Sequence, residues 1–240
     1  SKNYAVWKNT LDTALKKYPD TRFLLHTGDM VDVGQSIWHW DQFMKAAQEE
    51  FLSLPILPAV GNHEVINKNF TNNDAKNFTD SFNLPLIENT GAPVGTVYSV
   101  DYGNAHIAVM NSQCGSSNLK KQAEWLREDM NKSDKPWKIV AIHRGPYGAF
   151  YNTTDLQREW VPVFDELGIN LVLSGHDHNY VRTHPMKNGK VVEEGSGTIY
   201  MIGNTGGVKF YELVPRPWQA VDLQPNKQMY IAITVTSLKL

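Results

Sequence analysis

Four short hydrophobic runs in this chain each end in side chains that bind metal ions. The polar segments at their ends are Gly28-Asp29, Gly61-Asn62-His63-Glu64, His143-Arg144 and Gly175-His176-Asp177-His178. Because these runs alternate with helical patterns, they predict an α/β fold with a mainly parallel sheet covered by helices. Ligands in such folds gather beyond the carboxyl ends of the strands, where all four segments are expected. The sequence therefore predicts that the four segments meet at one site.

Composition restricts the classes of protein to which the chain can belong. Its 240 residues fit one large domain, and a single domain over 1–240 is expected. The formal net charge of -2 offers no basic field for a nucleic-acid backbone, so nucleic acid is not expected as a partner. No apolar run approaches the roughly 20 residues needed to cross a bilayer, so no membrane partner is expected. Cys114 is the only cysteine, which excludes a disulfide within the chain and a thiolate zinc cluster.

Hydrophobic periodicity indicates where helices and strands lie. Helical spacing predicts helices over 7–18, 40–52, 119–130 and 155–167. Apolar runs predict strands over 23–25, 56–60, 96–102, 106–110, 137–142, 169–173 and 229–240. Gly103-Asn104 and Asn188-Gly189 predict hairpin turns, and residues 65–93 predict a long surface excursion. Because the chain opens inside a helix and ends in a strand without a turn, we expect it to be truncated at both ends.

The candidate site residues differ in how strongly they indicate a function. An isolated Gly28-Asp29 is usually a turn or helix cap, and only the other three segments favour a metal-bridging carboxylate. Asn62 offers a hard carbonyl ligand, and the adjacent His63 points elsewhere and is free to act as an acid. The alternative for this pair is an Asx turn with a surface histidine.

The two later segments leave more alternatives open. By itself, His143 is more often a structural group than a ligand, and Arg144 either contacts a substrate phosphate or pairs with a carboxylate. His176 and His178 are two residues apart, so an extended backbone would turn both toward one metal pair. Asp177 would then point away and orient a neighbouring group.

Taken in order, these segments resemble the motifs of the calcineurin-like metallophosphoesterase superfamily. Trp40-Asp41-Gln42-Phe43 and the run Gly175-His176-Asp177-His178-Asn179-Tyr180-Val181-Arg182 make the chain similar to purple acid phosphatases in particular. The resemblance covers about residues 20–210. It implies a four-layer α/β/β/α sandwich with two divalent metal ions (Mn, Zn or Fe) at one edge.

The resemblance also implies a role for each residue. The implied metal ligands are Asp29, which bridges both ions, Asn62, His143 and His176 on one ion, and His178 on the other. A hydroxide activated by the two metals would attack a small phosphorylated substrate, most simply a phosphomonoester. His63 would protonate the leaving group.

Three departures from the family pattern qualify this expectation. The first motif, an Asp on the initial strand, has no match, so the fold is expected to lack its first strand and one metal to lack ligands. This chain is therefore expected to be impaired. Asp32 stands where purple acid phosphatases place a tyrosine, so neither purple colour nor ferric iron is implied. Tyr151-Asn152-Thr153 occupies the stretch where some members carry an extra histidine.

Two other functions remain open. One is a non-catalytic scaffold that keeps the fold without the chemistry, and the other is a phosphodiesterase or nucleotidase on the same fold. Relatives are often secreted, which slightly favours an extracellular or cell-surface location over the cytoplasm. The oligomeric state is left open.

Overall fold

A large mixed sheet organises the molecule. The structure is a computed structural model that describes residues 3–66, 75–151 and 153–237. The sheet has the order β11-β7-β10-β6-β5-β4-β3. Its strands are β3 (Tyr98–Tyr102), β4 (Ala105–Val109), β5 (Trp137–Ala141), β6 (Leu171–Ser174), β7 (Tyr180–Thr183), β10 (Ile199–Gly203) and β11 (Gln219–Leu223). The four central strands from β4 to β10 are parallel, whereas β3 and β7 pair antiparallel with their neighbours.

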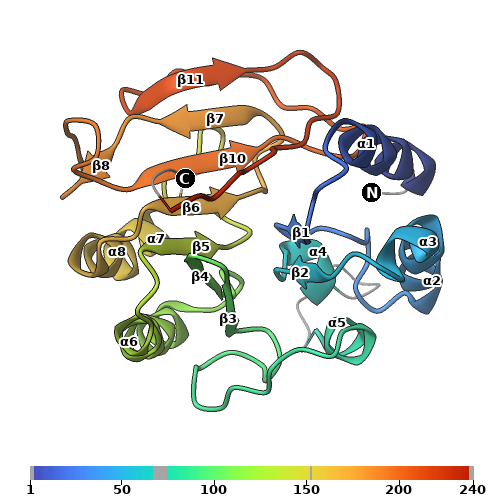
Figure 1. Ribbon diagram of the computed structural model, residues 1–240, viewed down its shortest axis with the longest axis horizontal. Helices are drawn as coiled ribbons and strands as arrows, with labels where there is room; N and C mark the ends of the chain where they lie inside the picture. Colours follow the sequence, from blue (N-terminus) through green and yellow to red (C-terminus); the bar gives the residue numbers. More distant parts are fainter. Residues whose placement is uncertain (1–2, 67–74, 152, 238–240) are drawn as a thin grey trace.

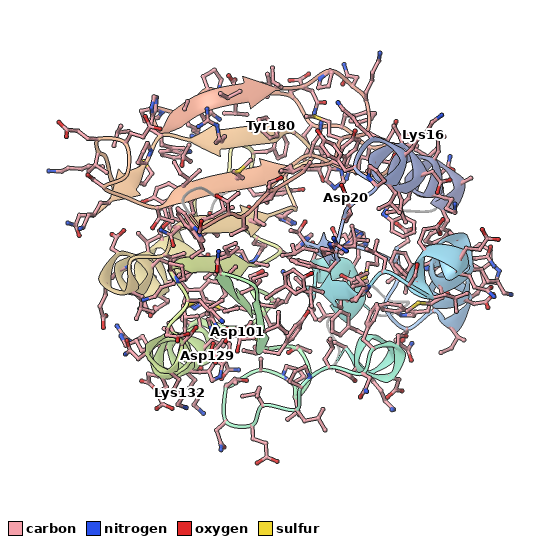
Figure 2. All side chains as sticks on the ribbon, viewed as in Figure 1. Lys16, Asp20, Asp101, Asp129, Lys132 and Tyr180 are labelled. Carbon is pink, nitrogen blue, oxygen red and sulfur yellow. The ribbon has the colours of Figure 1, made fainter. Side chains whose placement is uncertain are left out.

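A second, smaller sheet faces the large one. It consists of β1 (Leu24–His26) and β2 (Ile56–Pro58), which pair in parallel. Leu25 and Leu57 pack against a buried cluster of the large sheet that includes Ile139 and Leu171, which joins the two sheets through an apolar layer. Side chains fill the space that the ribbons leave between the two sheets (Figure 2).

Helices cover the outer sides of the two sheets. Their bounds are α1 (Tyr4–Lys17), α2 (Ile37–Ala46), α3 (Gln48–Phe51), α4 (Asn62–Val65), α5 (Lys76–Ser81), α6 (Ser116–Lys132), α7 (Thr154–Glu159) and α8 (Val161–Leu167). In Figure 1, α6, α7 and α8 lie on one side of the large sheet, and α2, α3 and α5 lie beyond β1 and β2. Trp160 and Phe164 anchor the first group in the main core, and Trp40 and Phe43 anchor the second. None of the helices in the described part of the chain is both long and apolar enough to cross a membrane.

The structure corrects several details of the expected secondary structure. The large sheet is mixed, because β7 and β11 add antiparallel pairs at one edge. The predicted helix over 155–167 is two helices, because Pro162 has no N–H to continue the first one beyond Trp160. Residues 229–237 contain no strand, whereas the excursion over 65–93 contains the short helix α5. The hairpin predicted at Asn188-Gly189 is present between β8 (Met186–Lys187) and β9 (Lys190–Val191).

The arrangement of strands places the four polar segments together. β1 and β2 lead into Gly28-Asp29 and Gly61-Asn62, and β5 and β6 lead into His143 and Gly175-His176. All four strands are parallel to their partners, so their carboxyl ends face one edge shared by the two sheets. This agrees with the expected position of a site in an α/β fold. A single domain over 1–240 stays a prediction.

Candidate metal centre

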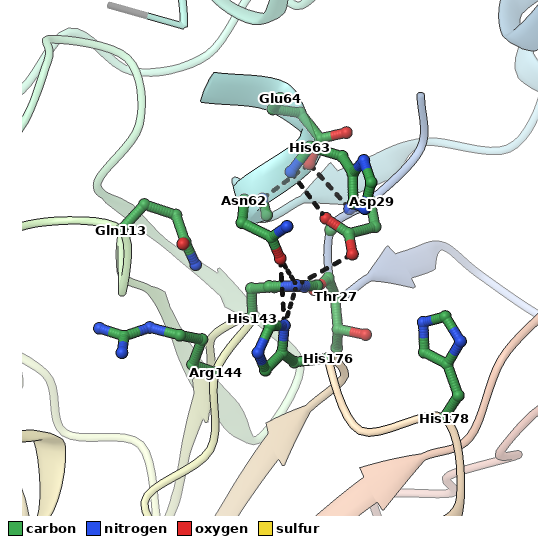
Figure 3. A network of polar contacts seen from close by, with 12 residues as sticks. Thr27, Asp29, Asn62, His63, Glu64, Gln113, His143, Arg144, His176 and His178 are labelled. Carbon is green, nitrogen blue, oxygen red and sulfur yellow. Dashed lines mark hydrogen bonds and ion pairs between the residues drawn. The ribbon is translucent and has the colours of Figure 1, made fainter. Parts of the chain in front are cut away.

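Residues from all four segments meet at the edge between the sheets. Asp29, His143 and His176 each present a ligand atom, and these atoms lie within 4.8 Å of one another. Asn62 joins them, because its Oδ1 lies 3.1 Å from His143 Nε2 and 3.0 Å from His176 Nδ1 (Figure 3). The structure therefore brings together four of the five predicted metal ligands.

The chemistry of these atoms fits a cation. His143 Nδ1 lies 2.7 Å from the carbonyl of Thr27, which only accepts hydrogen bonds, so the proton of the neutral ring is on Nδ1. The lone pair on Nε2 then faces His176 Nδ1 at 3.2 Å and Asp29 Oδ2 at 3.2 Å. The Asp29 carboxylate only accepts hydrogen bonds, so its contact with this lone pair needs a positive charge between the two atoms. A metal ion or a second proton on the His143 ring can supply that charge.

Electrostatics of the buried residues agrees with this interpretation. Burial alone pushes the pKa of Asp29 up, but the neighbouring His143 outweighs burial and holds that pKa well below its ordinary value. For His143, burial acts in the opposite direction and lowers the pKa. The charge and hydrogen bond of Asp29 outweigh burial, so the pKa of His143 is raised above its ordinary value. Burial and the adjacent His143 lower the pKa of His176 to about 3, which leaves its ring neutral and able to bind a metal.

The backbone at the site is unusual at three positions. Gly28 has a φ of 97°, and a Cβ there would lie 2.7 Å from both Gly61 N and His143 Nδ1. Asp29 and His176 also adopt left-handed conformations, with φ of 57° and 68°. Such conformations cost roughly 1–3 kcal/mol each in residues other than glycine and cluster at functional sites. The close approach of the two sheets thus requires glycine at position 28.

Glu64 is a site residue to which the sequence assigned no role. Its side chain is buried, with 1% of the residue exposed. Its carboxylate accepts backbone N–H groups from both loops: Asp29 at 2.7 Å, Met30 at 2.8 Å, Val31 at 3.2 Å and Gly61 at 2.7 Å. Burial raises the pKa of Glu64, and the charge of Asp29 adds to this increase. Glu64 therefore fixes the loop after β1 to the loop after β2. The capping-box spacing from Gly61 to Glu64 is the signal that could have indicated it.

His63 lies beside the cluster and is held in position by two contacts. Its backbone N–H donates to Asp29 Oδ1 at 3.0 Å. Its Nδ1 lies 2.8 Å from the carbonyl of Asp32, so this ring nitrogen carries a proton. Asp32, which stands where purple acid phosphatases have a tyrosine, thus orients the ring through its backbone.

The structure does not bring His178 into the cluster. The left-handed backbone at His176 ends the extended conformation on which the expectation of a shared direction depended. His178 instead places Nδ1 2.8 Å from the carbonyl of Lys209, apart from the cluster (Figure 3). Its role as a ligand of a second metal stays a prediction.

The two neighbouring polar residues have structural partners. Asp177 accepts the backbone N–H groups of Ala149 at 2.6 Å and Phe150 at 2.8 Å, so it orients a loop. Arg144 donates to Asp155 at 2.9 Å and to the carbonyl of Ser112, which favours the carboxylate pairing over the phosphate contact.

Comparisons with known proteins place this site in a family. The sequence model of the calcineurin-like phosphoesterases matches residues 2–180. Purple acid phosphatase 18 of Arabidopsis thaliana is 25% identical over 83% of this chain and 46% of its own length. Human acid phosphatase type 7 is 28% identical over 75% of this chain and 47% of its own length. The chain thus spans about half the length of these relatives.

A solved structure shows the same fold. A purple acid phosphatase from yellow lupin (Lupinus luteus) seeds superposes with a TM-score of 0.74 at 24% identity, covering 90% of this chain and 42% of that one. This agreement confirms the α/β fold class. Because the family match extends over most of the sequence, the chain belongs to the calcineurin-like phosphoesterase family.

Proposed function

We propose that this chain is the core of a metal-dependent phosphoesterase that hydrolyses small phosphate monoesters. The observation that carries the proposal is the convergence of possible ligand atoms from Asn62, His143 and His176 beside the Asp29 carboxylate. Carboxylate, amide and imidazole groups together form a common donor set for divalent metals such as Mn, Zn or Fe. Bound divalent metals in such sites polarise the phosphoryl group and activate water near neutral pH.

The residues of the chain would divide the remaining work. Asp29, Asn62, His143 and His176 would hold one metal, and Asp29 and His178 would help to hold a second. His63 would give a proton to the leaving-group oxygen from Nε2, because Nδ1 is engaged with the Asp32 carbonyl. Proton donation of this kind is typically worth about 10²–10⁴-fold in rate.

Metal dependence and substrate class can be tested together. The protein, loaded separately with Mn²⁺, Zn²⁺ or Fe²⁺, should hydrolyse alkyl monoesters faster than the matching diesters, and Asp29→Asn should remove both bound metal and activity. Asp165→Asn is the control and should change neither, because Asp165 lies in α8 and accepts the N–H of Asn188, outside the ligand cluster. Hydrolysis that persists after complete chelation would refute the proposal, and a preference for diesters would favour the phosphodiesterase alternative.

A non-catalytic scaffold remains the second candidate. One relative is named probable inactive purple acid phosphatase 24, from Arabidopsis thaliana, and is 26% identical over 89% of this chain. Among the residues that the structure describes, only Asp29, His143 and His176 form a group of three imidazole or carboxylate side chains close enough to share a metal ion. Absence of metal binding in the purified protein would favour this candidate. An extracellular or cell-surface location is likewise a proposal.

A further inference from the structure

Three aromatic side chains form a continuous surface beside the metal centre. We call Phe150, Tyr151 and Tyr211 the aromatic shelf. Phe150 stacks on Tyr211 with 4.8 Å between ring centroids and 23° between ring planes. Tyr151 meets both rings edge-on, and its hydroxyl lies 3.2 Å from that of Tyr211. The first two residues follow β5, and Tyr211 lies between β10 and β11, so the shelf joins two distant segments.

The shelf contacts the histidines of the site directly. The ring of Tyr151 lies 4.3 Å from that of His176, and the ring of Tyr211 lies 4.5 Å from that of His178 at an interplanar angle of 9°. Since His176 is one of the converging ligands, the shelf borders the position that a bound phosphate takes under the proposed function.

Backbone contacts hold the shelf in place. Asp177, which lies between the two histidines, accepts the N–H of Phe150 at 2.8 Å. The N–H of Tyr211 donates to the carbonyl of His178 at 3.0 Å. The segment 176–178 therefore positions both halves of the shelf, which makes the rings a preorganised surface.

Exposure distinguishes the shelf from the hydrophobic core. Phe150 is 45% exposed and Tyr151 is 38% exposed, and neither ring is part of the buried clusters of the described residues. Their packing partners are each other, Tyr211 and a site histidine. Aromatic rings attract other planar rings through stacked or edge-to-face contacts, an effect beyond the burial of area. Open ring surfaces next to a reaction centre thus favour a planar ligand.

We propose that the aromatic shelf binds the leaving group of the substrate, so that the preferred substrates are phosphate esters of planar aromatic alcohols. The inference rests on the proposed function for the position of the phosphate. A saturated ring of similar size would bury comparable area on the shelf but would lack the stacking contact. The shelf therefore determines specificity between flat and puckered leaving groups.

Binding tests this inference independently of hydrolysis. Dissociation constants of benzylphosphonate and cyclohexylmethylphosphonate, which cannot be hydrolysed as esters, would be measured on the metal-loaded protein by calorimetry. We expect about twofold to tenfold tighter binding of the benzyl compound. Phe150→Leu should bring the ratio close to one, whereas Phe150→Tyr, which keeps the ring, should retain it. Tyr102→Leu is a matched control, because Tyr102 is half-exposed and ends β3 at the opposite edge of the sheet.

Kinetics then separate the inference from the proposed function. The ratio of kcat/KM for benzyl phosphate over cyclohexylmethyl phosphate, whose leaving alcohols are similarly basic, should follow the binding ratio in every variant. If the protein binds the benzyl compound preferentially but hydrolyses neither ester, the proposed hydrolysis is overturned and the shelf inference is supported. The shelf inference is overturned if the unmodified protein shows no binding preference, if Phe150→Leu keeps it, or if neither phosphonate binds.

Discussion

Glu64→Gln should both destabilise the protein and weaken its metal site. The substitution keeps the shape of the side chain but replaces one carboxylate oxygen with an NH₂ group. Each oxygen of Glu64 accepts two backbone N–H groups, from Met30 and Val31 on one side and from Asp29 and Gly61 on the other. Whichever way the new side-chain amide turns, its NH₂ group faces two buried backbone N–H groups, and neither of these can then donate a hydrogen bond to it.

The size of the effect follows from these contacts. Hydrogen bonds to charged groups contribute about 1.5–3 kcal/mol each, so two lost bonds amount to about 3–6 kcal/mol. Removing the repulsion between Glu64 and Asp29, which raises the pKa of Glu64, offsets part of this cost. We therefore expect a net loss of about 2–4 kcal/mol in the free energy of unfolding. Because the same contacts orient Asp29, metal affinity should fall about 10–100-fold.

Urea unfolding of chelated protein measures the first effect, and competition with a chelator measures the second. Glu166→Gln is the matched control, since Glu166 is half-exposed and pairs only with Arg127 in the contacts that the structure shows. An exposed pair of this kind contributes about 0–1 kcal/mol. The reasoning is wrong if Glu64→Gln unfolds within about 0.5 kcal/mol of this control, or if its metal affinity is unchanged.

Three further predictions concern the acid, the metal content and a buried histidine. His63→Ala should slow hydrolysis of esters with poor leaving groups by about 10²–10⁴-fold, while elemental analysis finds the same amount of bound metal; equal loss of metal would contradict the role as an acid. The 240-residue chain should hold at most one metal firmly, and two metals at full occupancy would show that the ligand assignment is incomplete. Hydrogen bonds to Asp129 and then Asp101 raise the pKa of His106 above 6.5 despite its burial. The contribution of His106 to stability is therefore complete below pH 6.5 and is lost as the pH rises through the raised value; urea unfolding from pH 6 to 9 should show this loss in the natural protein but not in His106→Gln.

The sequence predicted the meeting of the four segments because each follows an apolar run, and parallel strands deliver such residues to one edge. It did not predict most contacts of Glu64, because three of the four N–H groups that this carboxylate accepts, those of Asp29, Met30 and Val31, lie more than 30 positions earlier in the chain. The extended backbone assumed for His176 and His178 was wrong, because His176 is left-handed. The rule of alternation holds only in extended backbone, so it does not apply to this pair.

The sequence analysis missed three strands, β7, β10 and β11, for other reasons. β7 and β11 are four and five residues long and mix charged with apolar side chains, so neither forms a continuous apolar run. β10 alternates between partly exposed and buried residues and pairs with β6 in parallel and with β7 antiparallel. Its run of apolar residues over 199–202 is a strand signal that the sequence prediction passed over.

The candidate metal centre is held in shape by contacts within the protein itself. His143 joins the two sheets through its bond to the Thr27 carbonyl, and Glu64 joins the loops after β1 and β2. Together these contacts bring Asn62 Oδ1, His143 Nε2 and His176 Nδ1 within 3.0–3.2 Å of one another, beside the Asp29 carboxylate. The contact between a neutral His143 Nε2 and that carboxylate is unfavourable without a positive charge between the two atoms, and the surrounding fold must maintain it. The cost of assembling the ligands is therefore met by folding, which leaves the free energy of metal binding available for affinity.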